Sequence, residues 1–113
     1  MAFKTPLHMI YHVTTEHQWA EAQQRGFYEA PSLHTEGFIH FSRREQVKGV
    51  LQRYYRDITG LVVLEVEESE LKAPMIYETS ASINEEFPHL YGPLNLDAVK
   101  GLKPADIYKN DHS

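Results

Sequence analysis

The sequence predicts a single small α+β domain. Its 113 residues are 42% hydrophobic and 24% charged, which is ordinary for one globular domain with its own core. Runs of β-branched and aromatic residues predict about six short strands, and two capped segments predict two helices, both in the N-terminal half. Helices segregated in this way are typical of α+β folds rather than of alternating βαβ folds. We expect residues 1–113 to form one domain with a loose tail from 109 to 113.

The first two predicted elements are a strand and a helix. Residues 7–13 are rich in β-branched and aromatic side chains and predict the strand. Thr15 then begins a capping box, in which threonine and glutamine side chains satisfy free backbone N–H groups. The box predicts a helix to about Arg25, ended by Gly26 in the left-handed conformation.

The next segment leads into the clearest helix of the chain. Residues 27–37 are predicted to be loop-rich, because Pro31 opposes regular structure. A short buried strand over 37–41 is followed by a second capping box, which starts at Ser42. The helix after it has apolar residues at the i, i+3, i+4, i+7 spacing of one face, namely Val47, Val50, Leu51 and Tyr54.

The C-terminal half is predicted to be mostly strands. Residues 61–66 form an unbroken apolar run, which predicts a central strand covered on both faces. Residues 75–78 predict a further strand, and residues 87–93 are dense in aromatic residues and turn formers. We predict a short turn or helix over 94–99 and a terminal strand over 102–108.

Composition excludes several functional classes. The chain has no cysteine, which rules out disulfides, thiolate catalysis and cysteine-ligated zinc. Its formal net charge of −5 disfavours general nucleic-acid binding and an anionic membrane surface. We expect a cytoplasmic protein, since no stretch resembles a signal peptide or a membrane span, and the oligomeric state is left open. An anionic ligand requires a local basic patch, for which the candidates are Arg43, Arg44, Lys48 and Arg53.

Three histidines predict a polar pocket as the active region. His12 ends the first strand, His40 shares a strand face with Ser42, and His89 lies in a segment whose bulk indicates packing. A single strand histidine is more often structural than catalytic, and Ser42 is explained as a helix N-cap. The N-cap role does not exclude ligand binding, because helix N-termini also present N–H groups to anions.

Three blocks of the sequence resemble a known family. IYHVT, EGFIHFS and FPHLYG together are similar to the uncharacterised bacterial and plant family filed as domain of unknown function 952, in residues 10–14, 36–42 and 87–92. That family resembles in fold the ADP-ribosyltransferase superfamily, a split, strongly bent β structure with a nicotinamide-dinucleotide cleft between its halves. The resemblance implies an enzyme that uses NAD and cleaves or transfers at the nicotinamide–ribose bond.

The resemblance also implies roles for individual residues. His12 matches the first-strand residue that contacts ribose and phosphates, and His40, with Ser42 behind it, matches the motif that holds the nicotinamide. The glutamate of the third motif has two candidates, Glu78 by order and His89 as the more distinctive residue. We predict His12, His40 and His89 as catalytic, and cofactor contacts from Thr14, Phe38, Ser42, Arg43 and Tyr91.

Two alternatives come from other functional classes. The same histidine-lined pocket is also predicted to suit a non-catalytic module that binds a nucleotide or another small ligand. Three imidazoles are also a common zinc-ligand set, although their spacing here matches no local zinc motif. A metal site would therefore need the three histidines to converge from distant elements.

Overall fold

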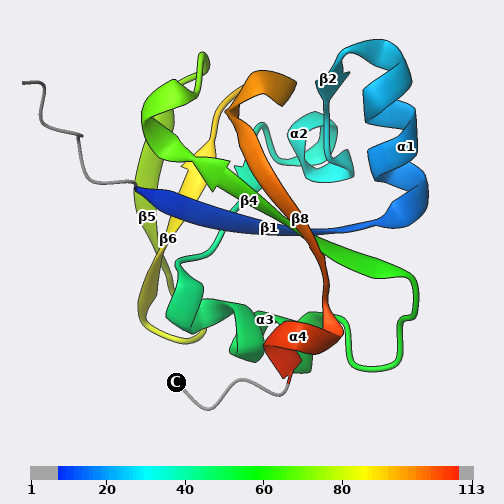
Figure 1. The fold of residues 1–113 in the computed structure, drawn as a ribbon. Helices are drawn as coiled ribbons and strands as arrows, with labels where there is room; N and C mark the ends of the chain where they lie inside the picture. The colour runs from blue at the N-terminus through cyan, green and yellow to red at the C-terminus, as the bar shows by residue number, and fades with distance from the viewer. Residues whose placement is uncertain (1–7, 110–113) are drawn as a thin grey trace, which may run out of the picture.

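The protein is an α+β structure, as predicted. The computed structural model describes residues 8–109, which contain eight short strands and four α-helices. A central antiparallel sheet has the strand order β1-β4-β8 (Figure 1). Its strands are β1 (Met9–Thr15), β4 (Leu61–Glu67) and β8 (Val99–Pro104).

Two smaller antiparallel sheets accompany the central one. Three strands pair in the order β3-β6-β5, and a two-stranded sheet joins β2 to β7. These strands are β2 (Phe27–Tyr28), β3 (Ile39–His40), β5 (Met75–Ser80), β6 (Glu85–Leu90) and β7 (Leu94–Asn95).

The helices cover both sides of the central sheet. They are α1 (Glu16–Arg25), α2 (Pro31–Thr35), α3 (Val47–Tyr54) and α4 (Asp106–Lys109), with the 3-10 helices η1 (Arg44–Gln46), η2 (Glu68–Glu70) and η3 (Leu96–Ala98). In Figure 1, α3 and α4 lie together on one side of this sheet, and α2 and β2 lie on the other. Between residues 8 and 109, no helix is long and apolar enough to cross a membrane.

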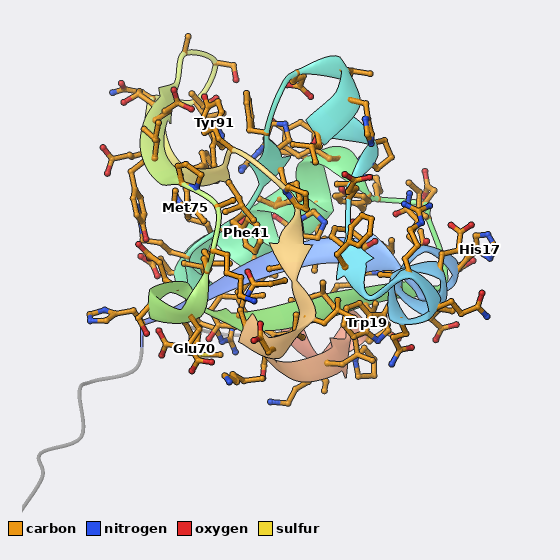
Figure 2. All side chains as sticks on the ribbon, turned by 90° about the horizontal axis from the view of Figure 1, so that it is seen from above. His17, Trp19, Phe41, Glu70, Met75 and Tyr91 are labelled. Carbon is orange, nitrogen blue, oxygen red and sulfur yellow. The ribbon has the colours of Figure 1, made fainter. Side chains whose placement is uncertain are left out.

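Side-chain alternation on β4 divides the core into two parts. Leu64 and Val66 point into the larger part, whereas Val63 points into the smaller part beneath α3 and α4. The fully buried Phe41 belongs to the larger part and lies near the middle of Figure 2, with Trp19 of α1 packed at its edge. The predicted central strand is therefore confirmed, because β4 is covered on both faces.

Local capping explains the first helix. The Thr15 side chain accepts a hydrogen bond from the backbone N–H of Gln18, and Gly26 has the left-handed φ of 92°. The N–H of Gly26 donates to the carbonyl of Ala22, which closes the last turn. Both predicted ends of α1 are confirmed.

Two predictions between residues 27 and 46 are wrong. The predicted loop contains β2 and α2, because Pro31 stands at the first position of a helix, where its missing N–H costs nothing. Ser42 does not cap the following helix, since its backbone instead pairs with Tyr11 of β1. The first turn begins after Arg43, whose N–H donates to the Gln46 side chain.

The C-terminal prediction is also corrected. The last strand, β8, covers 99–104, and the chain then turns into α4, so the predicted strand over 102–108 and the restriction of helices to the N-terminal half are both wrong.

Tyr54 is exposed, because α3 ends there and the next residue, Tyr55, packs on the smaller core instead. Most of the predicted loose tail, residues 110–113, lies outside the described residues.

Candidate functional site

An aromatic and charged cluster forms where β3, β5 and β6 meet. We call it the Phe38 cluster, and it consists of Phe38, His40, Glu78, His89 and Tyr91. His40 on β3 stands directly opposite His89 on β6 in the strand register. Glu78 on β5 lies diagonally across from His89, because β5 pairs Ile76 with His89 and Glu78 with Phe87. Antiparallel pairing thus assembles the cluster from segments that are distant in sequence.

Ring contacts organise the cluster around Phe38. The His89 ring stacks on it at 4.1 Å between centroids and 18° between planes. The His40 ring meets Phe38 edge-on at 4.8 Å, and Tyr91, labelled in Figure 2, lies tilted at 5.2 Å. The two imidazoles approach each other edge-on at 5.1 Å. This arrangement offers π surfaces beside two imidazoles, which suits a planar ligand.

Glu78 is held as a carboxylate by two donors. Its Oε1 atom accepts hydrogen bonds from the Tyr91 hydroxyl at 2.5 Å and from His89 Nδ1 at 2.7 Å. The bond from Tyr91, followed by the bond from His89, lowers the pKa of the Glu78 carboxyl. The same contact raises the pKa of the Tyr91 hydroxyl. Because Nδ1 of His89 donates to Glu78, the Nε2 atom of a neutral His89 is an acceptor.

His40 extends the cluster toward solvent. Its Nε2 atom lies 3.2 Å from Oε2 of Glu36, which precedes it by four residues. The side chains of both residues are about half exposed. The Phe38 cluster and the neighbouring Glu36 therefore place two carboxylates beside aromatic faces at the surface of the molecule.

His12 lies behind the cluster, inside the core. Only 6% of its surface is exposed. Its Nδ1–H donates to the main-chain carbonyl of His40 at 2.5 Å, and its Nε2 lies 2.7 Å from the Tyr28 hydroxyl. Burial lowers the pKa of His12 to about 4, so the imidazole is neutral at pH 7. A neutral imidazole with its proton on Nδ1 accepts at Nε2, and the Tyr28 hydroxyl can donate there.

The hydrogen bonds of His12 continue to a cleft. The Tyr28 hydroxyl, whose pKa burial raises to about 12, lies 2.9 Å from Thr14 Oγ1. Thr14 Oγ1 in turn lies 2.8 Å from the Gln18 side-chain amide. Gln18 and Tyr28 both line a cleft of about 230 Å³ that also includes residues of α1 and α2. The chain of contacts thus runs from the carbonyl of His40 to that cleft.

The structure brings together only some of the predicted site residues. His40, His89, Phe38 and Tyr91 meet in the Phe38 cluster, and Glu78 joins them. The prediction that His12 lines one pocket with the other two histidines is wrong, because His12 is buried and both its ring nitrogens are bonded inside the core. What each residue does there stays a prediction.

Three further predicted contacts lie elsewhere. Thr14 and Ser42 are buried, with Thr14 in the hydrogen-bond chain of His12 and Ser42 bridged to β1. The Arg43 guanidinium donates hydrogen bonds to the Glu45 carboxylate and to the main-chain carbonyl of Glu86.

A metal site of three histidines does not fit this geometry. Within the described part of the chain, no three residues among His, Cys, Asp and Glu are arranged to hold a metal ion. The imidazole of His12 also has no free nitrogen for a metal, because one nitrogen donates to the His40 carbonyl and the other lies 2.7 Å from the Tyr28 hydroxyl.

The sequence patterns did not predict two of the contacts around the site. Tyr28 contacts His12, although its segment was predicted to be a loop, and no local pattern identified it. Glu36 pairs with His40, and it stands inside the EGFIHFS block, where the four-residue spacing was the available signal.

Acidification is expected to destabilise the fold through His12. The pKa of His12 falls from 6.5 to about 4 on folding. Below pH 6.5 this imidazole is therefore protonated in the unfolded chain but stays neutral in the folded protein. The contribution of His12 to the free energy of unfolding is fully present above pH 6.5. It is lost as the pH falls toward 4, by up to about 3 kcal/mol. Urea denaturation at pH 7.0, 5.5 and 4.5 measures this loss, and the difference between wild type and His12→Asn isolates it from other groups. Identical pH slopes in the two proteins would contradict the assignment.

Comparisons with known proteins give a family and a fold. A model of the family described as Protein of unknown function (DUF952) matches residues 13–102. The crystal structure of protein CC0527 from Caulobacter crescentus is 31% identical, with a TM-score of 0.78 over 86% of this chain and 85% of that chain. The solution NMR structure of CC0527 is 31% identical, with a TM-score of 0.69 over 85% and 83% of the two chains. No curated protein matches the chain.

Proposed function

The chain belongs to the DUF952 family of proteins of unknown function, and we propose that it binds NAD at the Phe38 cluster and cleaves the nicotinamide–ribose bond. The observation that carries the proposal is the Glu78 carboxylate, which is oriented by Tyr91 and by His89, whose ring stacks on Phe38. The central sheet and the β3-β6-β5 sheet would be the two halves of an ADP-ribosyltransferase-like split β structure.

The chemistry of the cluster matches the nicotinamide end of NAD. The oxidised nicotinamide ring is planar, aromatic and positively charged. Aromatic faces attract such a cation, and Glu36 adds negative charge beside His40. Phe38 and Tyr91 supply these aromatic faces, and their ring centroids are 5.2 Å apart.

Bond cleavage moves positive charge toward Glu78. The bond between the nicotinamide nitrogen and ribose C1 breaks with its electron pair going to the nicotinamide, and the ribose becomes cation-like. A fixed carboxylate stabilises that developing charge more than it stabilises the ground state. Oε1 of Glu78 accepts both hydrogen bonds, and the lowered pKa of the carboxyl keeps the group ionised at neutral pH. C1 then bonds to the oxygen of water or of an acceptor hydroxyl, and Nε2 of His89 can take the released proton.

The positions of Glu78, His89 and His12 give these residues other roles in the proposed reaction than the family resemblance implies. Glu78 supplies the acid of the third motif, and His89 orients it, so both candidates for that motif act together. His40 lies where the second motif is expected, next to Phe38. His12 contributes from inside the core rather than by contacting ribose or phosphates.

An NMR titration with NAD tests the proposed site. We expect shifts confined to signals of Phe38, His40 and His89, followed by nicotinamide release that is detectable by chromatography. Phe38→Ala should abolish the shifts, while Phe27→Ala, which changes a partly exposed phenylalanine of the α1–α2 cleft, should leave them intact. Shifts centred on the cleft, or no shifts at millimolar NAD, would contradict the proposal.

A second candidate function is ligand binding without turnover. The half-exposed side chains of His40 and Glu36 favour it, because an open site does not exclude water or fix a substrate as catalysis requires. In that case the same titration would give localised shifts at the cluster, and no nicotinamide would appear over an incubation of days. The release assay therefore separates the two candidates.

A further inference from the structure

We propose that His12 is a positioning residue that fixes His40 for ligand binding, through its hydrogen bond to the main-chain carbonyl of His40. The proposal rests on the proposed function, since it names a residue that supports the Phe38 cluster from inside the molecule. It follows from the pairing of β3, from the two bonds of the His12 ring and from the path of the strands around them.

Strand β3 leaves the carbonyl of His40 without a strand partner. Among the described residues, β3 pairs only with β6. Phe41 N–H donates to the Pro88 carbonyl at 2.9 Å, so residues 39 and 41 direct their main-chain groups toward β6. The main-chain groups of His40 therefore face the opposite way, where the imidazole of His12 meets its carbonyl at 2.5 Å. A side chain of β1 takes the place of a neighbouring strand.

The position of the His40 peptide determines the position of its ring. His40 and His89 are opposite each other in a non-hydrogen-bonded pair, where side chains approach most closely and no backbone bond fixes the pair directly. Their rings are 5.1 Å apart. The carbonyl carbon is bonded directly to the Cα atom that carries the ring, so the bond from His12 restrains this point of β3, and its loss lets the strand shift and loosens the contact with His89.

The fully bonded ring of His12 makes it suitable for this role. One nitrogen donates to His40, and the other is paired with Tyr28, which is itself buried. The backbone bridge between Tyr11 and Ser42 joins the same two segments, with bonds of 2.7 and 2.8 Å. The bridge fixes the separation of β1 and β3, and His12 sets the orientation of the peptide between them.

Two amide side chains separate the bonds of His12. The amide nitrogen of asparagine occupies the place of Nδ1, so His12→Asn keeps a donor for the His40 carbonyl. The amide of glutamine occupies the place of Nε2, so His12→Gln keeps a partner for Tyr28 and loses that donor. Tyr28→Phe keeps both ring nitrogens of His12 and removes only the hydroxyl.

The ring signals of His40 and His89, recorded by NMR without ligand, give the first readout. We expect His12→Gln to shift or broaden both signals, and His12→Asn to restore them close to the wild-type positions. Tyr28→Phe should lower the unfolding midpoint and leave both signals in place. The affinity for NAD should fall by roughly 10- to 100-fold in His12→Gln, and it should recover in His12→Asn.

Two outcomes would overturn the proposal. Wild-type ring signals and wild-type affinity in His12→Gln would show that the bond to His40 does not position its ring. Equal disturbance in His12→Asn and His12→Gln would show that loss of core packing, rather than of the donor, is responsible. The ligand-free spectra report on His40 even if wild type binds no NAD, so failure of the proposed function is distinguishable from failure of the positioning role.

Discussion

Replacing Glu78 by glutamine is expected to slow nicotinamide release by about 10²- to 10³-fold, the usual cost of removing one preorganised group that stabilises transition-state charge. Glutamine has nearly the same shape and can still accept from Tyr91, but it carries no charge to oppose the cation that develops on the ribose. The effect should therefore appear mainly in kcat, with a small change in KM.

Steady-state assays of nicotinamide release give the measurement. Glu86→Gln is the matched control, because Glu86 is an exposed acid of β6 whose main-chain carbonyl, rather than its carboxylate, accepts the bonds from Arg43 and Gln46. Its rate should stay within about twofold of wild type. A rate for Glu78→Gln as high as that of Glu86→Gln would remove Glu78 from the catalytic mechanism.

Truncation of Leu64 to alanine is expected to destabilise the protein by about 2–5 kcal/mol. Leu64 is 0% exposed on the central strand, and it stands between His12 of β1 and Leu102 of β8 in the register. The deletion removes buried methyl groups and leaves a cavity that the flanking strands cannot close, because both are fixed by the backbone hydrogen bonds of the sheet.

Urea denaturation with an unchanged m-value measures this loss as a shift in midpoint. Leu102→Ala is the control, since Leu102 lies next to Leu64 on the same face but is 45% exposed. Its loss should be well under half that of Leu64→Ala. Comparable losses in the two variants would mean that burial at β4 is not what stabilises the sheet.

Local patterns predicted the elements that depend on neighbouring residues. The cap at Thr15, the left-handed Gly26 and the buried run of β4 were all confirmed, because each is determined by a few adjacent side chains. The same logic failed at Pro31 and Ser42. A proline can occupy the first position of a helix as well as interrupt regular structure. The backbone of Ser42 pairs with Tyr11 of β1, a contact that local sequence does not reveal.

The candidate site shows the same division. Membership of the DUF952 family was accessible through short motifs in the sequence, and the same motifs carry His40, His89 and Phe38, which the structure brings together. The motifs did not reveal that the two third-motif candidates, Glu78 and His89, contact each other, because this contact forms only when β5 pairs with β6. Nothing in the sequence indicated that Tyr28 would meet His12 in the core.

The sequence by itself determined the α+β class, the central strand, the first helix and the family, because these follow from periodicity, capping and short motifs. Only the tertiary structure decided that His12 is buried while His40 reaches the surface, although both are strand histidines. The difference arises because the His12 ring packs against the buried rings of Tyr28 and Phe41, whereas β3 is a two-residue strand whose side chain at His40 faces solvent. Burial depends on what covers a strand, and that covering comes from residues far away in the chain.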